Sequence, residues 1–390
     1  MRVRPYGGED ETRRDEPKHR RRFALGLSDW DSPPPGHLDA GIVGDVLLTD
    51  TLWTAAGPQV TADLRSACWT RLAGCSIVLA NLEAPISSVP KPADRKPYNF
   101  RTDVRALDLF DQRFVLSLAN NHIMDYGAQG LVDTLEVLDR AGLSYAGAGT
   151  TLDRARAPHY RSVTGIETAI LCAADPRFQA ATASTPGTCP ARPGLLAESV
   201  TEARRRARFV AVAIHMGMEH STTPSTRQID LAEECLDAGA RFVAFHHAHR
   251  IGGYSTSGRG IVLWGTGNYV FADGNERPRG KTARTAAWRV RYSQPADAVT
   301  ALSIEPAVID RAGVPRTPDA GEAARERERI HGLGSRVRTP LRRTMWHSLE
   351  MLEPEFVRSN VTNYARLLRL RGLSYVWRSL VAGLRAQLTR

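Results

Sequence analysis

Short apolar runs alternate with amphipathic stretches along most of the chain. The apolar runs predict buried strands over residues 41–48, 76–80, 114–116, 168–173, 209–214, 242–245 and 261–264. Between them, apolar residues recur every three or four positions. This spacing predicts helices over residues 60–72, 127–142, 198–208 and 229–239. Strand followed by helix, repeated in this way, is typical of a layered α/β domain with both sheet faces covered.

The two ends of the chain differ in composition from the middle. Residues 1–37 mix charges of both signs and finish in a Ser-Pro-Pro-Pro-Gly run, so we expect a disordered arm there. We expect a catalytic domain over residues 38–310, because the stretch 286–309 alternates like strands. From about Pro318 the pattern predicts a basic helical extension over residues 311–390. Its last apolar stripe consists of Val376, Leu380, Leu384 and Leu388. This stripe favours helices that pack on the domain over a helix that lies on a membrane surface.

Arginine supplies almost all of the net charge of +10, since only four of the 52 basic residues are lysines. Residues 336–390 carry eleven arginines against three glutamates, so this segment suits an acidic partner or an anionic surface. A solvated helical face is the simpler interpretation. The aromatic residues of the segment fall at helical core positions rather than on a stacking surface, so we expect no nucleic-acid partner.

Composition also limits the class of protein. No run of about 18 apolar residues is present, so we expect no membrane span. The first 22 residues lack the apolar core of a signal peptide, and we expect a cytoplasmic enzyme. The five cysteines are scattered and form no CxxC pair, which argues against a disulfide framework and against a structural zinc site.

Polar side chains follow five of the predicted strands. They are Asp45, Glu83, the Asn121-His122 pair, His215, and the His247-Ala248-His249 group. One histidine after a strand is more often structural than functional. Five such groups at the same end of successive strands predict a shared site, and carboxylate, amide and imidazole groups are ligands of divalent metals. Both imidazoles of the His-x-His group can point into that site if the backbone bends there, and residues two apart in a regular strand share a face in any case.

These residues belong to longer motifs. They are Gly44-Asp45, Asn81-Leu82-Glu83-x-Pro85, Ala119-Asn120-Asn121-His122-x-x-Asp125-Tyr126-Gly127, His215-x-Gly217-x-Glu219, and His247-x-His249 with Gly267-Asn268. From about Gly41 to Phe271 the chain resembles the CapA family, which is named for poly-γ-glutamate capsule synthesis and is a branch of the calcineurin-like metallophosphoesterases. The Ala-Asn-Asn-His block is the most specific part. The resemblance implies a four-layer α/β sandwich with a dinuclear metal centre.

The resemblance also implies a role for each motif residue. The implied ligands are Asp45 and His249 for one cation, Glu83 as a bridge, and Asn121, His215 and His247 for the other. His122 would be the unligated acid/base. The other catalytic candidates are Glu219 and Asp125, and the substrate-binding candidates are Asn81, Arg101, Asn120 and His220. The cofactor would be one or two divalent cations of manganese, zinc, iron, calcium or magnesium.

The chain also departs from the family pattern. Phosphoesterases generally have Asp-x-His at the first motif, but this chain has Leu47 in place of the imidazole, so the first metal would bind weakly or be absent. Met216 and His220 stand where Trp and Tyr are usual, and Phe245 and Ala248 where Gly and Pro are common. These changes around the pocket indicate a substrate different from that of the capsule proteins.

Three functions remain open at this point. Some soluble members of the CapA family invert a Cα centre in a ribosomally made peptide such as a lasso-peptide precursor, and we expect this chemistry first, with His122 removing the Cα proton. An acidic leader segment of such a peptide could dock on the Arg-rich extension. The alternatives are metal-dependent phosphoester hydrolysis, with His122 protonating the leaving group, and an accessory role in poly-γ-glutamate assembly.

Overall fold

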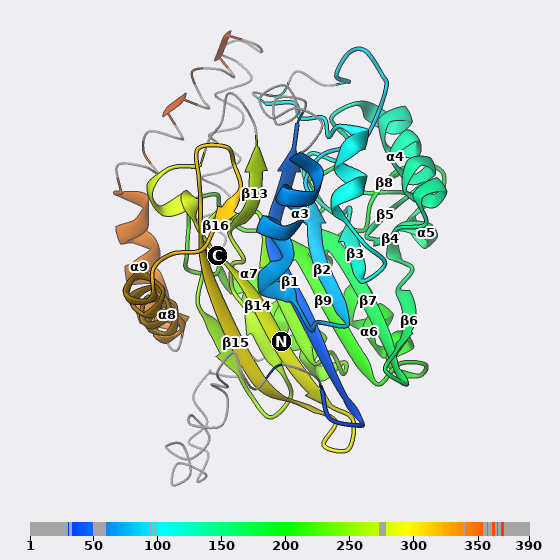
Figure 1. Ribbon diagram of the computed structural model, residues 1–390. Coiled ribbons are helices and arrows are strands. Elements are labelled where there is room, and N and C mark those ends of the chain that lie inside the picture. Colours follow the sequence, from blue (N-terminus) through cyan, green and yellow to red (C-terminus); the bar gives the residue numbers. More distant parts are fainter. Residues whose placement is uncertain are drawn as a thin grey trace, which may run out of the picture.

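A computed structural model describes most of the chain (Figure 1). The described residues are 30, 33–49, 60–93, 96, 98–272, 278–337, 340–353, 357, 361–362, 365 and 368–369. Most of the predicted N-terminal arm and the apolar stripe from Val376 to Leu388 lie outside them. Among the described residues, no helix combines the length and the apolar character that crossing a membrane requires.

The first sheet has eight strands, in the order β16-β15-β14-β1-β2-β3-β4, with β13 also paired to β1. Its strands are β1 (His37–Leu48), β2 (Ile77–Leu82), β3 (Phe114–Ser117), β4 (Ser144–Ala146), β13 (Asn268–Ala272), β14 (Arg284–Ser293), β15 (Ala298–Ile309) and β16 (Pro315–Arg316). One edge of β1 serves two partners. Its first half pairs antiparallel with β14, and its second half pairs parallel with β13.

The second sheet has six strands, in the order β11-β12-β10-β9-β7-β6. They are β6 (His159–Val163), β7 (Ile166–Ala174), β9 (Phe209–His215), β10 (Phe242–His246), β11 (Tyr254–Thr256) and β12 (Ile261–Leu263). The central strands β7, β9, β10 and β12 are parallel to one another. A small separate pair is formed by β5 (Ala148–Gly149) and β8 (Gly187–Thr188).

Helices lie on the outer faces of both sheets (Figure 1). The α-helices are α3 (Val60–Trp69), α4 (Gly127–Ala141), α5 (Leu152–Arg156), α6 (Leu195–Arg204), α7 (Thr226–Asp237), α8 (Ala320–Gly334) and α9 (Pro340–Met351). The 3-10 turns are η2 (Thr70–Leu72), η3 (Val104–Leu109), η4 (Gly280–Ala283) and η5 (Ser335–Val337). Their apolar stripes arise from the spacing seen in the sequence, as in α4, where Leu131 and Leu138 are fully buried.

Three apolar layers separate the sheets and helices. On β2, Leu79 faces the second sheet, whereas its neighbour Val78 faces α3 and α4. On β9, Ala211 faces the first sheet and Val212 faces α6 and α7. The order helix, sheet, sheet, helix confirms the predicted four-layer α/β sandwich.

Most predicted elements are present, with shifted ends. The helix predicted over 198–208 begins earlier and forms α6, and the stretch 286–309 forms β14 and β15 as predicted. The predicted strand 41–48 begins at His37, because pairing with β14 extends it. The first sheet continues into β16, beyond residue 310, where we placed the end of the catalytic domain.

Candidate metal centre

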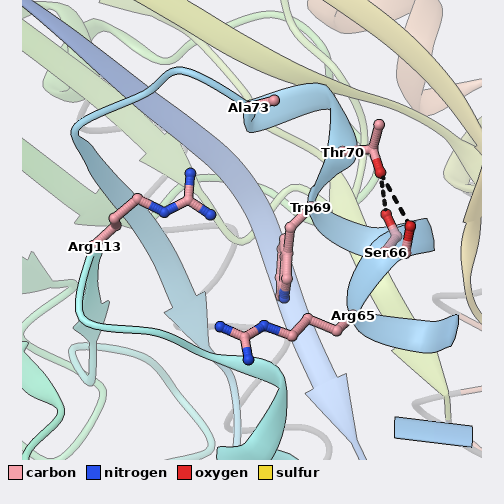
Figure 2. A pocket seen from close by; sticks show the side chains of 6 residues that line it. All are labelled: Arg65, Ser66, Trp69, Thr70, Ala73 and Arg113. Atoms are coloured by element: carbon pink, nitrogen blue, oxygen red, sulfur yellow. Dashed lines mark hydrogen bonds between the residues drawn. The ribbon is translucent and has the colours of Figure 1, made fainter. Parts of the chain in front are cut away.

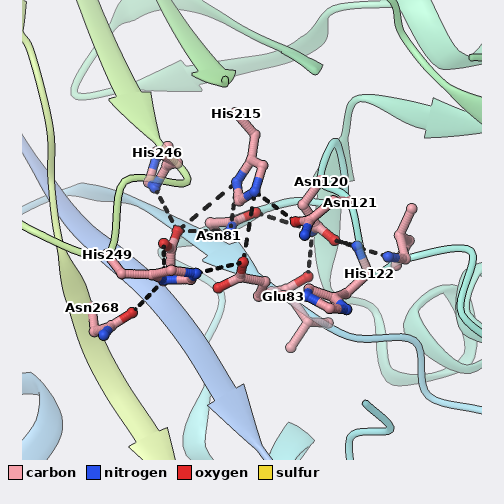
Figure 3. A network of polar contacts seen from close by, with 12 residues as sticks. Asn81, Glu83, Asn120, Asn121, His122, His215, His246, His249 and Asn268 are labelled. Carbon is pink, nitrogen blue, oxygen red and sulfur yellow. Dashed lines mark hydrogen bonds and ion pairs between the residues drawn. The ribbon is translucent and has the colours of Figure 1, made fainter. Parts of the chain in front are cut away.

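The predicted polar groups converge between the two sheets, at the carboxyl ends of their parallel strands (Figure 3). Asp45 belongs to β1, Glu83 follows β2, and Asn121 lies beyond β3. From the other sheet, His215 ends β9, and His249 lies just after β10. Parallel strands place their carboxyl ends at one edge, so groups far apart in the sequence meet there.

An irregularity in β1 brings Asp45 to this edge. The pairing of β1 with β2 shifts register between Ile42 and Asp45. At this point β1 approaches the chain before β13 so closely that a Cβ on Gly44 would lie 2.0 Å from the carbonyl oxygen of Gly267. The amide of Asp45 donates to the same carbonyl at 2.9 Å. Only glycine allows this approach, which explains the Gly-Asp pair of the first motif.

Asp45, Glu83 and His249 form the centre of the cluster. One ligand atom from each lies within 4.8 Å of the other two. His249 Nδ1 is 3.3 Å from Asp45 Oδ2, and its Nε2 is 4.0 Å from Glu83 Oε1. On the other side of Glu83, the same Oε1 is 3.6 Å from His215 Nε2. Glu83 therefore lies between the two imidazoles.

The donor atoms of this cluster fit a divalent cation. Asp45 Oδ2, both carboxylate oxygens of Glu83 and His247 Nδ1 are buried without a hydrogen-bond partner among the described residues. A buried carboxylate oxygen that receives no hydrogen bond is costly, and a cation can satisfy several such oxygens at once. A mixed set of carboxylate, amide and imidazole donors suits manganese, iron or zinc.

Two carboxylates this close repel one another. Burial raises the pKa of Glu83 well above its ordinary value, and the charge of Asp45 adds to this effect. Burial acts on Asp45 in the same direction, but hydrogen bonds from His246 and His249 outweigh it and lower the pKa of Asp45. For His249, burial would lower the pKa, but Glu83 and Asp45 raise it to about 10. The protein without a cation therefore holds protons here that a metal must displace.

Asn121, His215 and His247 lie together on the other side of Glu83. His215 Nε2 is 2.8 Å from Asn121 Oδ1, and the His215 and His247 rings are 4.9 Å apart between centroids. Burial lowers the pKa of His247 to about 4, and it lowers the pKa of His215 as well. Both rings are thus neutral near pH 7, the state in which imidazole binds a metal.

The two histidines of the His-x-His motif converge through a bend of the backbone, one of the two ways that we expected. Strand alternation, the other way, does not apply, because β10 ends at His246. His247 and His249 both have left-handed backbone, with φ of 88° and 54°. Such conformations cost non-glycine residues about 1 to 3 kcal/mol each and are held by the surrounding structure.

His122 and Asp125 form a buried hydrogen-bonded pair beside the cluster. His122 Nδ1 is 2.7 Å from Asp125 Oδ2, and the Phe100 ring lies 4.5 Å from the imidazole between centroids. Asp125 also accepts from the Phe100 amide at 2.8 Å and from Lys96 Nζ at 2.6 Å. Asp125 is one of the predicted catalytic residues, and both of its oxygens are engaged in hydrogen bonds. It orients His122, whose Nε2 is left for proton transfer.

Glu219 and His220 follow β9 and lie at the edge of the centre. Burial would raise the pKa of Glu219, but His247 and His249 outweigh it and lower the value. Burial and the neighbouring His249 lower the pKa of His220 to about 4. The rings of His220 and His249 are 6.3 Å apart between centroids. Glu219 is therefore a further carboxylate, besides Asp45 and Glu83, whose charge interacts with His247 and His249.

Three of the predicted substrate-binding residues take other places. Asn81 and Asn120 are fully buried, and Asn81 donates to Asp45 Oδ1 at 2.9 Å. Asn120 donates to Asn81 Oδ1 at 3.1 Å and accepts from the amides of the turn that follows it. The Asn81 side chain therefore holds the predicted ligand Asp45, and the Asn120 side chain holds Asn81. Arg101 donates to the Val89 carbonyl at 3.3 Å and lines a separate hollow of about 620 Å³.

Two residues of the centre were missing from our prediction. His246 Nδ1 lies 3.1 Å from Asp45 Oδ1, and Asn268 Oδ1 lies 2.8 Å from His249 Nδ1. Both orient a predicted ligand. His246 directly precedes the His-x-His group, and Asn268 belongs to the Gly-Asn motif. Both positions were visible in the sequence, but we predicted only His247 and His249 as ligands. Leu47, which replaces the usual imidazole, lies in an apolar cluster with Phe100 and Phe271.

A further hollow of about 480 Å³ lies beside α3 (Figure 2). Arg65 and Arg113 flank Trp69 there, and both guanidinium groups pair with Asp111. This hollow lies near the start of β3, whereas the metal ligands gather beyond the ends of the strands. Because its arginines are already paired, it offers no comparable chemistry.

Comparison with known proteins identifies the domain that carries this centre. Residues 40–273 match the family described as bacterial capsule synthesis protein PGA_cap. The chain belongs to this family. The PGA_cap domain thus includes every predicted ligand, from Asp45 to His249, but it ends before β14, β15 and the C-terminal helices.

Two relatives are about one third identical to this chain over the aligned residues. The PGA biosynthesis protein CapA of Bacillus subtilis is 35% identical over 209 residues, which cover 52% of this chain and 55% of the relative. The capsule biosynthesis protein CapA of Bacillus anthracis is 36% identical over 172 residues, covering 42% of each. The chain therefore spans about half the length of these relatives or less.

Solved structures are less similar. A chain from Mycoplasma pneumoniae, described as a novel phosphatase, aligns with 73% of this chain and 96% of its own length. Its TM-score is 0.46 and its sequence identity 9%.

Proposed function

We propose that this chain is a divalent-metal-dependent enzyme that cleaves an amide bond in a γ-linked glutamate polymer during polymer assembly. The observation that carries the proposal is the group of buried carboxylate oxygens on Asp45 and Glu83 that have no hydrogen-bond partner among the described residues, next to the His122–Asp125 pair. Membership of the PGA_cap family and the names of its relatives, which concern capsule and PGA biosynthesis, support the polymer as substrate.

The side chains present indicate which residues would hold the cations. Asp45, Glu83 and His249 would hold one cation, and Asn121, His215 and His247 a second. A cation bound here would polarise the substrate carbonyl and lower the pKa of water near it.

His122 supplies the proton. Asp125 accepts from Nδ1, so Nε2 is the atom that exchanges a proton with the substrate. His122 Nε2 takes a proton from water as the water oxygen adds to the carbonyl carbon, and it delivers this proton to the leaving nitrogen as the C–N bond breaks. Glu219 is too closely associated with the ligand histidines to serve as the primary acid in this scheme.

Metal content is the first test of the site. We expect Asp45→Ala and His247→Ala to remove most of the bound metal, because each deletes a donor from a buried set. Elemental analysis of the purified proteins measures it, with the exposed Asp153→Ala as the matched control. Unchanged metal in both site variants would contradict the assignment of the ligands.

Product analysis tests the reaction. With manganese added, we expect the chain to shorten a γ-glutamyl oligomer, as measured by mass spectrometry, and His122→Ala to abolish this activity. A chelator should abolish it as well, and the metal should restore it. Phosphate release from an aryl phosphate, with the oligomer intact, would instead indicate a phosphoesterase.

A second candidate is inversion of a Cα centre in a peptide. One observation favours it: Glu219 is close enough to His122 and His247 for their charges to affect its pKa, so the centre holds two acid/base candidates. Inversion needs one group to remove the Cα proton and another to return it on the opposite face. A peptide with an acidic leader segment would suit the Arg-rich extension.

Isotope exchange separates the two candidates. In deuterium oxide, inversion adds one mass unit at Cα without cleaving the chain, whereas hydrolysis leaves Cα unlabelled. The same incubation of the γ-glutamyl oligomer and of candidate peptides therefore distinguishes them. Label at Cα in an uncleaved peptide would replace the hydrolase proposal with the epimerase.

A further inference from the structure

Two carboxylates from the C-terminal extension reach the loops that carry the metal centre. Glu350 belongs to α9, and Glu353 follows it, so both lie outside the PGA_cap domain. The first loop they meet, the 216–223 loop, follows β9 and contains Glu219 and His220. The second, the 247–250 loop, follows β10 and contains two predicted ligands. Figure 1 shows α8 and α9 side by side at one flank of the sandwich.

Glu350 binds the end of the 216–223 loop. Its Oε2 accepts from Ser221 Oγ at 2.7 Å and from the Thr222 amide at 3.2 Å. Its Oε1 accepts from the hydroxyl of Thr222 and, at 3.2 Å, from that of Thr223. Arg336 balances its charge from 3.3 Å. Glu350 is only 3% exposed, so these hydrogen bonds form out of water and hold the loop firmly.

Glu353 connects the two loops through Arg250. Its Oε2 accepts from Arg250 Nη1 at 2.9 Å, and its Oε1 from Lys281 Nζ at 2.7 Å. The same Nη1 of Arg250 donates to the carbonyl of His220 at 2.5 Å. The His220 amide in turn donates to the Ala248 carbonyl at 2.8 Å. Arg250 is buried and directly follows the predicted ligand His249, so one guanidinium ties both loops to the extension.

These loops need such restraint because their backbone is strained. His220, His247 and His249 all have positive φ, of 65°, 88° and 54°. None is glycine, and residues with a Cβ adopt this region only where the surroundings hold them there. Glu350 and Glu353 supply contacts of this kind at the ends of the loops. Neither carboxylate is placed to contact the donor atoms of the metal centre itself.

We propose that Glu350 and Glu353 are positioning residues, through which the C-terminal extension holds the 216–223 and 247–250 loops in the geometry that the metal centre requires. The inference rests on the metal centre of the proposed function but not on the reaction. The PGA_cap domain of this chain is then completed by a helix that the family match does not include.

Hydrogen exchange of the metal-free, full-length protein tests the restraint directly. We expect Glu350→Ala and Glu353→Ala to speed amide exchange in the 216–223 loop about tenfold, because hydrogen bonds to a charged group are lost. Glu350→Gln keeps one acceptor oxygen and should have a smaller effect. The exposed Glu328→Ala on α8 is the matched control and should change nothing.

Metal affinity provides the second readout. We expect both alanine variants to weaken manganese binding about tenfold and to change the visible spectrum of the cobalt-loaded protein, whereas Glu328→Ala leaves both as in the parent. If Glu350→Ala does not fold, the same measurements are made on Glu353→Gln, because Glu353 is partly exposed and its substitution disturbs the fold less. Exchange, affinity and spectrum that match the parent in the folded variants would overturn the proposal. Faster exchange in a protein that binds no metal would uphold the restraint and refute the metal-dependent function.

Discussion

Asp125 accepts three hydrogen bonds, and they determine what His122 can do. The Phe100 amide and Lys96 fix the carboxylate, and the carboxylate fixes His122 Nδ1 at 2.7 Å. With the carboxylate accepting from Nδ1, Nε2 is the ring nitrogen left for proton exchange in the proposed reaction. At the residue scale, the chemistry depends on this pair as much as on the metal ligands.

Replacing Asp125 with Asn tests this dependence. The amide can donate to Nδ1 and thereby favour the opposite tautomer, so we expect kcat on the cleaved substrate to fall about 10²- to 10⁴-fold. Metal content should not change, because Asp125 is not a proposed ligand. Steady-state kinetics and elemental analysis of the same preparation measure both quantities. A loss of metal together with activity would show instead that Asp125 supports the ligand cluster.

Metal affinity should depend on pH. In the metal-free protein, the pKa of His249 is raised to about 10, so this ring holds a proton near neutral pH, and the raised pKa of Glu83 makes this carboxyl hold its proton to a higher pH than usual. Binding a cation displaces these protons, so lowering the pH favours the metal-free form. We therefore expect the manganese dissociation constant to increase from pH 8 to pH 6. Calorimetric titrations in two buffers with different ionisation enthalpies also count the protons released, and a constant affinity with no proton release would contradict this prediction.

At the scale of single elements, β1 changes partner and register within twelve residues. The register shift lies just before Asp45, the carboxylate that this strand contributes to the site, whereas its other carboxylate, Asp39, pairs with Arg291. It depends on the close approach of Gly44 to the chain before β13, where no side chain fits.

Gly44→Ala should therefore damage both the strand and the site. The new Cβ would meet the Gly267 carbonyl, and relieving such a clash costs about 1 to 3 kcal/mol or more of unfolding free energy. We expect a lower melting temperature and weaker metal binding. Gly258→Ala is the matched control, because nothing lies within 4 Å of a Cβ at that exposed position. Equal stability of the two variants would argue against the close approach.

The two sheets share one apolar layer, and the metal centre lies at its end. Trp288 on β14 is fully buried in that layer, together with side chains from β9 and β10. The ligands come from both sheets, so the distance between Asp45 and His249 depends on how this layer is packed. At the scale of the whole molecule, packing between the sheets sets the geometry of the site.

The variant Trp288→Ala tests whether packing between the sheets sets the geometry of the site. Removing a buried indole leaves a cavity, and we expect the free energy of unfolding in urea to fall by about 3 to 5 kcal/mol. Trp288→Phe should cost less, because it retains the ring and removes an Nε1 that has no hydrogen-bond partner among the described residues. Metal affinity should fall in the alanine variant alone. A stability loss equal in both variants would indicate that the indole N–H has a partner.

Periodicity predicted most strands and helices, because apolar spacing reports directly which face is buried. The position of polar groups after successive strands predicted the site, since parallel strands end at one edge. Neither pattern could predict the β13 pairing with β1, which joins residues more than two hundred positions apart. The sequence also left open whether a backbone bend or strand alternation aligns His247 and His249, and their left-handed backbone, which depends on neighbouring loops, shows the bend.

The layered α/β architecture and the donor types could be predicted from the sequence, because both follow from which residues are apolar and which polar groups stand at each strand end. The folded chain was needed to find that His246, Asn268 and Asn81 orient the ligands, and that Asp125 positions His122. It alone brought Glu350 and Glu353 to the loops of the centre. These contacts join distant segments through side-chain geometry, which no local pattern in the chain encodes.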